Sequence, residues 1–436
     1  MNGTIKVKGG IPLKGEVIPV PNKNAILGAL PAAILTDKDV IFHNVPKSTD
    51  VELMIEMMKK MGANVDDSDY NNLKINCKSL HSYKIDKELG ERIRASIMFV
   101  GPLLTRFGKA EVPVPGGCVL GMRSIAAHVE VFSKVDVKVE YKDGVVEFIS
   151  PKDLKPDYLV WQSEASVTAT ENFILYAAGT DSNFEIIDAA SEPHVTEVAE
   201  LVVSMGAKIN GIGSNKLEIS GTKNLSGGDF IPSADHVDIV GYIVAAALTK
   251  GHIRIKNAND PKVAGIYLNW FPKFGVGLKT DGADLVIDGS HKLEIDIKNS
   301  GFPMAGPDMP KFVPRPWPGF PVDCLPPVIT LACKVEGRVL FYNWMYETGL
   351  DFAKHLNAMG ANIEMIDPQK VIVNGPITFR SDEVTSPEVI QGCMAIFLAA
   401  LTDPVETTIH GVDVLKRRYP NIFECYKKLG ADIEYS

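Results

Sequence analysis

The sequence of 436 residues contains no long hydrophobic run, no CxxC cysteine pair and no excess of basic residues. No stretch reaches the ~20 apolar residues that a membrane span requires, and the first residues form no apolar signal segment, so we expect a cytoplasmic protein without a membrane partner. The six cysteines are scattered, which argues against both a zinc site and a disulfide framework. The formal net charge of −9 argues against a nucleic-acid partner.

The chain has enough apolar residues for large cores, since 45% of its residues are hydrophobic. A pattern repeats six times along it, in which a helical segment ends in a short step, often Gly-Ala, before an alternating strand. The steps lie at positions 62, 136, 206, 275, 360 and 430, with separations of 74, 70, 69, 85 and 70 residues. This unit is longer than a solenoid repeat, so we expect two domains of three modules each. The glycine at most steps is expected to adopt left-handed backbone that ends the helix.

Most steps are preceded by a predicted strand and a predicted helix. Residues 40–46 lead into a helix over 50–60, and residues 184–188 lead into a helix over 196–205. Further predicted strands cover 253–257, 339–343 and 407–411. The longest spacing contains a proline-rich insertion at 301–321, which predicts a loop that serves as a lid or an edge.

One glycine-rich segment places a thiol close to an arginine. It reads Pro115-Gly116-Gly117-Cys118 and is followed by Gly121 and Arg123. Such a loop can present backbone N–H groups to an anion, and the nearby cation can favour the thiolate or hold an acidic substrate. The residues alone leave two interpretations open, an active-site loop or an ordinary turn around a small buried cysteine.

An ordered set of short motifs resembles the enolpyruvyl transferases. The resemblance runs along essentially the whole chain and includes the six repeats. Within the family the chain is most similar to the branch that acts on UDP-N-acetylglucosamine, because the shikimate branch lacks the Cys118 loop. The motifs are PNKNA at 21–25, IRAS at 93–96, GPL at 101–103, RFG at 106–108, PGGC at 115–118, SVTAT at 166–170 and FPVD at 320–323.

The resemblance implies a fold, a reaction and a pair of substrates. The fold is a pair of inside-out α/β barrels, each of three βαβαββ repeats, that close on the substrates. The implied domains are 1–21 with 234–436, and 22–233. The enolpyruvyl group of phosphoenolpyruvate would be transferred to a hydroxyl of UDP-N-acetylglucosamine, a step of cell-wall synthesis, with release of phosphate. No metal or organic cofactor is implied.

The resemblance also implies three catalytic residues. Cys118 matches the family's general acid, which protonates the methylene carbon and is the residue attacked by fosfomycin. Lys23 matches a lysine that binds phosphate and carboxylate. Asp323 matches the carboxylate that takes the acceptor's proton, although the sequence equally allows a helix N-cap before residues 325–327.

The remaining implied site residues bind substrate. Arginine suits this task because its planar guanidinium binds phosphate and carboxylate oxygens in pairs. The alignment leaves open whether Arg417 or the adjacent Arg418 is the family arginine near the C-terminus. The implied residues are Asn24, Arg94, Arg123, Ser166 and Arg417.

Several positions depart from the family's pattern for the acceptor. Ala126 stands where a carboxylate holds uracil, Glu164 replaces a lysine, and Ser191, His236 and Gly349 replace arginines. Each lost charge-assisted contact to a diphosphate forfeits roughly 1.5–3 kcal/mol. Three functions therefore stay open: transfer to UDP-N-acetylglucosamine, transfer to another acceptor such as a uridine nucleotide in nucleoside-antibiotic synthesis, and ligand binding without catalysis. The retained donor-site residues argue against the last.

Overall fold

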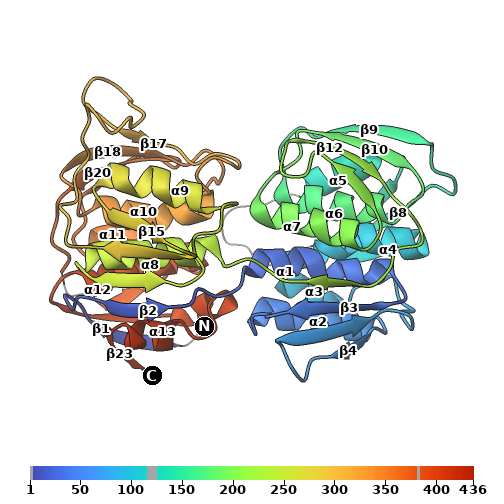
Figure 1. Ribbon diagram of the computed structural model, residues 1–436, viewed down its shortest axis with the longest axis horizontal. Helices are drawn as coiled ribbons and strands as arrows, with labels where there is room; N and C mark the ends of the chain where they lie inside the picture. Colours follow the sequence, from blue (N-terminus) through green and yellow to red (C-terminus); the bar gives the residue numbers. More distant parts are fainter. Residues whose placement is uncertain (1–2, 115–124, 381–382) are drawn as a thin grey trace. The chain divides into compact units, whose positions relative to one another are not determined.

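The computed structural model describes residues 3–114, 125–380 and 383–436 (Figure 1). Within these residues, contacts divide the chain into two compact units. The described part of unit 1 comprises residues 3–20 and 234–436, and that of unit 2 comprises residues 21–114 and 125–233.

Unit 1 contains three four-stranded sheets with the same order of neighbours in its described residues. In each sheet an edge strand pairs in parallel with a first central strand, which pairs antiparallel with a second central strand, which in turn pairs antiparallel with the other edge. The sheets are β2 (Lys14–Val17), β14 (His252–Ile255), β16 (Asp284–Asp288) and β15 (Gly277–Asp281); β17 (Lys311–Phe312), β18 (Gly337–Tyr342), β20 (Lys370–Gly375) and β19 (Ile363–Asp367); and β21 (Glu383–Thr385), β22 (Glu406–His410), β1 (Thr4–Lys8) and β23 (Asp432–Tyr435).

Unit 2 repeats this order. Its third sheet has three strands, and the place of the fourth is taken by a parallel bridge between Lys84 and Glu111. The pairing directions are those of unit 1. The sheets are β13 (Gly228–Phe230), β3 (Asp39–His43), β5 (Asn72–Asn76) and β4 (Asn64–Asp66); β9 (Asp157–Trp161), β10 (Asn183–Ile187), β12 (Lys216–Ser220) and β11 (Lys208–Asn210); and β6 (Lys109–Pro113), β8 (Val145–Ile149) and β7 (Lys138–Lys142).

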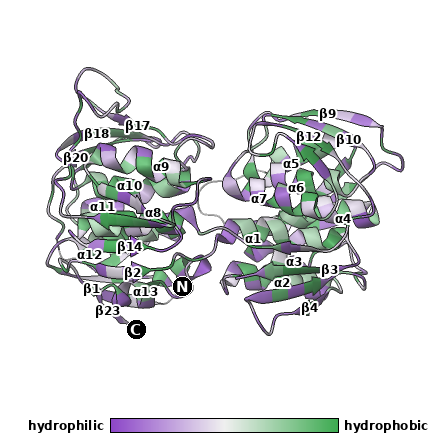
Figure 2. Ribbon diagram, in the orientation of Figure 1, coloured by the Kyte–Doolittle hydropathy of each residue, from purple (hydrophilic) through white to green (hydrophobic). Residues whose placement is uncertain are grey.

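The first helix of each repeat lies inside its unit. In unit 1 these helices are α8 (His236–Leu248), α10 (Leu325–Ala332) and α12 (Ile390–Thr402), which contact one another. Every residue of α8 and α10 is buried, as expected for helices composed mostly of apolar residues (Figure 2). In unit 2 they are α1 (Lys23–Ala29) with η1 (Leu30–Leu35), η2 (Arg94–Phe99) with α4 (Val100–Phe107), and α6 (Val167–Ala178).

The other helices complete the repeats. Several strands, such as β5, alternate buried and exposed residues, so one face of these strands packs inward and the other faces solvent. The predicted fold, with helices inside and sheets outside in two three-repeat units, is confirmed. The remaining elements are α2 (Thr49–Lys60), α3 (Lys87–Arg92), α5 (Ala126–Ser133), α7 (Pro193–Ser204), α9 (Ala264–Trp270), η3 (Phe271–Phe274), η4 (Val322–Cys324), α11 (Ala353–Ala358), η5 (Val412–Arg417) and α13 (Ile422–Lys428).

The six steps between helix and strand have positive φ angles. They are 101° at Gly62, 63° at Asp136, 124° at Gly206, 81° at Gly275, 97° at Gly360 and 102° at Gly430. The prediction that these positions end the helices is confirmed by these angles. Glycine is preferred there because a Cβ atom is disfavoured at positive φ. Asp136 is the one exception to glycine, and aspartate tolerates this backbone better than most residues.

The proline-rich insertion is not entirely a loop. Its residues Lys311 and Phe312 form β17, which pairs in parallel with β18 and supplies the edge of that sheet. The expectation of a loop is therefore wrong for these two residues, because the edge backbone pairs with the neighbouring strand, where the N–H of Leu340 donates to the backbone oxygen of Pro310 at 2.9 Å. None of the helices in the described ranges combines the length and apolar composition that crossing a bilayer requires.

Candidate functional site

Lys23 is held at the first residue of α1 by a buried ion pair. Its Nζ lies 2.8 Å from Oδ2 of Asp50 in α2, and both side chains are less than a tenth exposed. Asn22 caps the helix, because its Oδ1 accepts hydrogen bonds from the backbone N–H of Asn24 at 3.0 Å and of Ala25 at 3.4 Å. A cation at a helix start opposes the helix dipole, so Asp50 offsets both this repulsion and the cost of burial.

Arg94 opens η2, which contacts both α1 and α6. Its side chain is half-buried. Burial, together with the charge of Arg94, lowers the pKa of His128 in α5 to about 3. His128 is therefore neutral at pH 7, so of these two residues only Arg94 carries a positive charge.

The neutral His128 belongs to a buried hydrogen-bond network. The amide of Asn172 in α6 donates from Nδ2 to the backbone oxygen of Ile97 at 2.8 Å and lies 3.1 Å from Nδ1 of His128. Oδ1 of Asn172 accepts from the backbone N–H of Gly101 at 2.7 Å. Because Nδ1 accepts from Asn172, the ring proton lies on Nε2, which is 3.1 Å from Oγ1 of Thr168. The network connects η2, α4, α5 and α6.

Ser166 is the N-cap residue of α6 and uses only its backbone for this. Its backbone oxygen accepts from Thr170, while its N–H donates to the backbone oxygen of Glu164 at 2.7 Å. The side chain makes no capping hydrogen bond and is half-buried. Glu164 and Ala126, two of the positions that depart from the family pattern, are exposed, whereas Ser191 is buried.

In unit 1 Asp323 lies in η4, one residue before the N-cap position of α10. That position is Cys324, which makes no side-chain capping hydrogen bond. The interpretation of Asp323 as the N-cap of this helix is therefore wrong, because the chain forms the 3-10 turn η4 before α10 and this turn brings Cys324 to the N-cap position. Its side chain is 25% exposed, and Oδ2 lies 3.5 Å from Nη1 of Arg418.

Arg418 is buried and forms a bidentate pair with Asp235. Its Nε and Nη2 donate to the two carboxylate oxygens at 2.7 and 2.8 Å. Burial by itself would raise the pKa of Asp235, but the charge and hydrogen bonds of Arg418 outweigh burial and leave that pKa below its ordinary value. Of the two candidate arginines, Arg418 is thus the one that contacts Asp323, and Arg417, at the end of η5, is half-buried.

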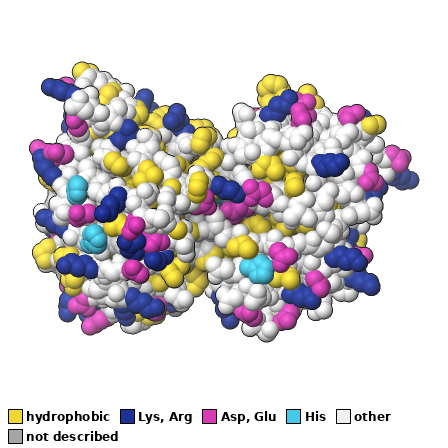
Figure 3. Space-filling view, viewed as in Figure 1, with side chains coloured by type: hydrophobic (Ala, Val, Ile, Leu, Met, Phe, Trp, Pro, Cys, Tyr) yellow, Lys and Arg dark blue, Asp and Glu magenta, His cyan; other side chains and the backbone are white. Residues whose placement is uncertain are grey.

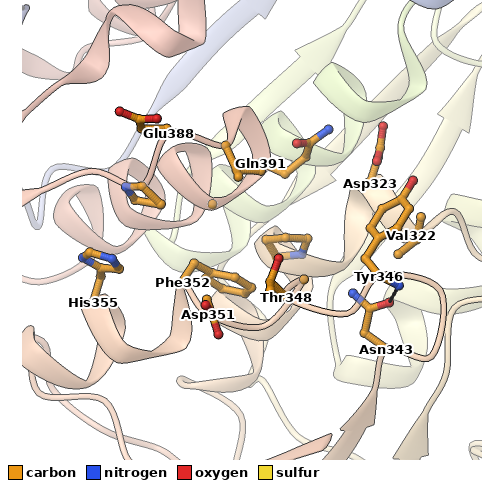
Figure 4. Close-up of a pocket in the computed structure, with 15 residues that line it drawn as sticks. Val322, Asp323, Asn343, Tyr346, Thr348, Asp351, Phe352, His355, Glu388 and Gln391 are labelled. Atoms are coloured by element: carbon orange, nitrogen blue, oxygen red, sulfur yellow. Dashed lines mark hydrogen bonds between the residues drawn. The ribbon is translucent and has the colours of Figure 1, made fainter. Parts of the chain in front are cut away.

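Asp323 also lines a cavity of about 230 Å³ within unit 1 (Figure 4). The wall is formed by η4, the start of α10, residues 343–355 and the segment that leads into α12. Among the described residues that line it, the fixed charges are three carboxylates, Asp323, Asp351 and Glu388. The cavity therefore suits a neutral, hydrogen-bonding part of a ligand better than a phosphate.

Gly349 is part of this wall. A Cβ atom there would lie 2.2 Å from Nδ2 of Asn343, so a larger residue requires Asn343 to move. The arginine that the family resemblance implies at position 349 would fit only if Asn343 moved. Sequence reasoning missed Tyr346, Glu388 and Gln391 of the wall, and the only signal was a Pro-Glu pair directly before the apolar run of α12.

The predicted site residues fall into two groups. Lys23, Asn24, Arg94 and Ser166 lie on neighbouring elements of unit 2, and Asp323 and Arg417 lie in unit 1. Cys118 and Arg123 lie outside the described residues. Within the part of the chain that the structure describes, no three His, Cys, Asp or Glu side chains are grouped to hold a metal ion.

Comparison with known sequences identifies relatives over nearly the whole chain. Residues 7–425 match the EPSP synthase (3-phosphoshikimate 1-carboxyvinyltransferase) family. A UDP-N-acetylglucosamine 1-carboxyvinyltransferase of Treponema denticola is 35% identical over 428 residues, which are 98% of each chain. One of Bradyrhizobium diazoefficiens is 37% identical and covers 98% of this chain and 97% of its own.

Comparison with solved structures gives the same fold. The enolpyruvyl transferase NikO from Streptomyces tendae superposes with a TM-score of 0.85 at 20% identity and covers 100% of this chain and 99% of its own. EPSP synthase from Acinetobacter baumannii superposes with a TM-score of 0.73 at 15% identity and covers 100% of both chains.

Proposed function

Because the chain belongs to the EPSP synthase family and is an enolpyruvyl transferase, we propose that it transfers the enolpyruvyl group of phosphoenolpyruvate to a hydroxyl of UDP-N-acetylglucosamine. The observation that carries the proposal is the position of Asp323, a carboxylate held beside a buried guanidinium at the wall of a cavity without a lining cation among the described residues. A carboxylate in this position can accept the proton of a neutral alcohol.

In the addition step, the acceptor oxygen bonds to the central carbon of phosphoenolpyruvate and its proton passes to Asp323. The methylene carbon receives a proton, for which Cys118 is the proposed donor. In the elimination step a proton leaves the resulting methyl group, the double bond forms again and phosphate departs with the electrons of its C–O bond. The protons gained and lost balance, and the products are the enolpyruvyl ether and inorganic phosphate.

The cations of the predicted site would bind the donor. Lys23 and Arg94 are fixed on adjacent elements of unit 2, where buried or half-buried cations interact strongly with phosphate and carboxylate groups. Arg123 and Arg417 are proposed to complete this set. Fixed cations stabilise the negative charge that moves toward the leaving phosphate in the transition state.

The departures from the family pattern raise a second candidate, transfer to another acceptor, of which a uridine nucleotide without the sugar is one example. Ala126, the first residue of α5, carries only a methyl group where relatives place a carboxylate for uracil. Glu164 is an exposed carboxylate at a position where a lysine would attract a diphosphate. Both changes weaken recognition of UDP-N-acetylglucosamine without affecting Lys23 or Asp323.

The test is release of phosphate from phosphoenolpyruvate with UDP-N-acetylglucosamine, UMP or shikimate 3-phosphate as the acceptor. We expect release with UDP-N-acetylglucosamine, and loss of most but not all of this release in both Asp323→Asn and Cys118→Ser. Release only with UMP would show that the second candidate, and not UDP-N-acetylglucosamine, is the acceptor. Binding of phosphoenolpyruvate with no release for any acceptor would contradict the proposal and favour a ligand-binding protein. Full activity of Cys118→Ser would exclude Cys118 as the proton donor.

A further inference from the structure

Two residues far apart in the sequence form the most buried ion pair of unit 1 that involves the site. Asp235 caps α8, because its Oδ1 accepts from the backbone N–H of Val237 at 2.9 Å. Both of its oxygens also accept from Arg418, at 2.7 and 2.8 Å. The side chains are 0% and 2% exposed, whereas that of Asp323 is 25% exposed. Arg418 thus has a buried counter-ion on one side and a partly exposed carboxylate on the other.

The bidentate pair fixes the direction in which Arg418 presents its remaining nitrogen. A guanidinium is planar and stays protonated, so two hydrogen bonds from Nε and Nη2 determine the position of Nη1. That nitrogen lies 3.5 Å from Oδ2 of Asp323. A lysine could supply the same charge, but its single nitrogen could not satisfy Asp235 and face Asp323 in one fixed geometry.

The position next to Asp235 explains why the cation comes from elsewhere. The family resemblance implies an arginine directly after this aspartate, and the chain has His236 there. His236 is buried, and burial lowers its pKa, so it does not supply a positive charge at neutral pH. Arg418, which follows η5, provides that charge from a different element.

We propose that Arg418 is a positioning residue for Asp323, and that Asp235 is the buried counter-ion that holds Arg418 in place. This inference rests on the proposed function, in which Asp323 accepts the proton of the acceptor hydroxyl. Arg418 does not touch the substrate in this scheme. It restricts the carboxylate to one orientation, so that Oδ1 of Asp323 is left for the hydroxyl. A small misplacement of such a group can cost about 100-fold in rate.

The experiment is a double-mutant cycle between Arg418 and Asp323, measured as kcat and KM for phosphate release. We expect Arg418→Met to lower kcat about 10- to 100-fold with the KM for phosphoenolpyruvate changed less than about twofold. In the Asp323→Asn background the same substitution should have little further effect on kcat, because the group that it positions is gone. Arg418→Lys should recover only part of the lost kcat.

A second variant separates positioning from folding. Arg418→Met leaves Asp235 buried without this cation, so Arg418→Met with Asp235→Asn removes both charges and should restore the melting temperature but not kcat. Arg254→Met is the matched control, since Arg254 also pairs with two aspartates of unit 1, Asp281 at 2.6 Å and Asp284 at 3.0 Å. Its kcat should equal that of the wild type.

The outcomes distinguish this inference from the proposed function. Equal loss of kcat on Arg418→Met in the wild-type and Asp323→Asn backgrounds would show a structural role and overturn the inference. Recovery of kcat in the double variant that lacks both charges would overturn it as well. Wild-type kcat in Asp323→Asn alone would instead contradict the role of Asp323 in the proposed function, whatever Arg418 does.

Discussion

Units 1 and 2 share one repeat and one sheet order, yet at two of the three inner helices of each unit the residues near the helix start carry opposite charges. In unit 2 these positions carry Lys23 and Arg94, and in unit 1 they carry Asp235 and Asp323. Figure 3 shows that elsewhere on the visible face acidic and basic side chains are intermixed. The difference between the units at these helix starts therefore does not follow from the fold that they share.

The buried ion pairs of the two units are reversed in the same way. In unit 2 the helix start supplies the cation, Lys23, and α2 supplies Asp50. In unit 1 the helix start supplies Asp235, and the cation is Arg418 from the end of η5. An acid at a helix start is stabilised by the dipole, whereas a cation there is not. We infer that the cations of unit 2 are kept for anionic ligands rather than for stability.

The largest expected effect is from Lys23→Met. It should lower kcat/KM at least ~100-fold, because a fixed cation for the transition state is lost. It should also lower the free energy of unfolding by about 3–5 kcal/mol, since Asp50 stays buried without this partner. Lys23→Met with Asp50→Asn should recover most of the stability and none of the activity. Urea unfolding and phosphate release measure the two effects, and recovery of activity in the double variant would contradict a ligand role for Lys23.

Asp238→Asn should remove an alkaline destabilisation of unit 1. Burial raises the pKa of Asp238 to about 8, and its Oδ2 accepts from the backbone N–H of Val20 at 2.9 Å. A carboxyl group whose pKa is raised by folding contributes its full stabilisation when the pH is below its ordinary pKa. This contribution is lost as the pH rises toward the pKa of the group in the folded protein. Between pH 5 and pH 8 this contribution falls by about 4 kcal/mol. Asparagine keeps the acceptor and does not titrate.

The measurement is the free energy of unfolding at the two pH values. The wild type should lose more stability than the variant, while Asp308→Asn, a change of an exposed aspartate in the same unit, should behave as the wild type. Burial also raises the pKa of Glu171 in unit 2 well above its ordinary value, so part of the alkaline decline should persist in every variant. Identical declines in the wild type and Asp238→Asn would contradict the assignment.

His128→Gln should have the opposite pH dependence in unit 2. The pKa of His128 is lowered to about 3 by burial and by Arg94, so its contribution to stability is present above the ordinary pKa and is lost as the pH falls. From pH 7 to pH 5 the wild type should lose about 2 kcal/mol through this group, and the variant should not. His252→Gln, at an exposed histidine, is the control. An equal loss of unfolding free energy between pH 7 and pH 5 in all three proteins would contradict this role of His128.

The smallest expected effect is that of alanine in place of the glycines that end helices in both units. Gly206→Ala in unit 2 and Gly430→Ala in unit 1 place a Cβ at φ angles of 124° and 102°, with no atom closer than 3.9 Å. Only the backbone opposes the change, so each should cost about 1–2 kcal/mol in unfolding free energy. Gly265→Ala in α9 also has open space but has no positive φ, so it should be neutral or stabilising. Unequal losses of unfolding free energy at Gly206 and Gly430 would contradict the view that the two helix ends share one backbone conformation.

Much of the fold could be predicted because its signals are local. The helix ends at Gly62, Gly206, Gly360 and Gly430 follow from glycine before a short strand, and the structure gives all four positive φ angles. The strand predicted over 184–188 is observed as β10 within one residue. The start of α7 lies three residues earlier than predicted, because Pro193 is favourable in the first turn of a helix.

The site was predictable to a smaller extent. Motif resemblance pointed to Lys23 and Asp323, but neither of their partners could be read from the chain. Asp50 lies 27 residues from Lys23 and comes from the next helix of the repeat. Arg418 lies 183 residues from Asp235, and the two meet only because α8 and the end of η5 belong to one unit.

The sequence by itself determined the repeat, the ends of its helices and the residue types available for chemistry, because backbone preferences and apolar spacing act over a few neighbours. Only the tertiary structure decided which charges are paired, that β17 becomes an edge strand, and that Asp323 lines a cavity beside a fixed guanidinium. The physical reason is that burial and ion pairing depend on distances between elements remote in the chain, and those distances are set by the packing of whole repeats.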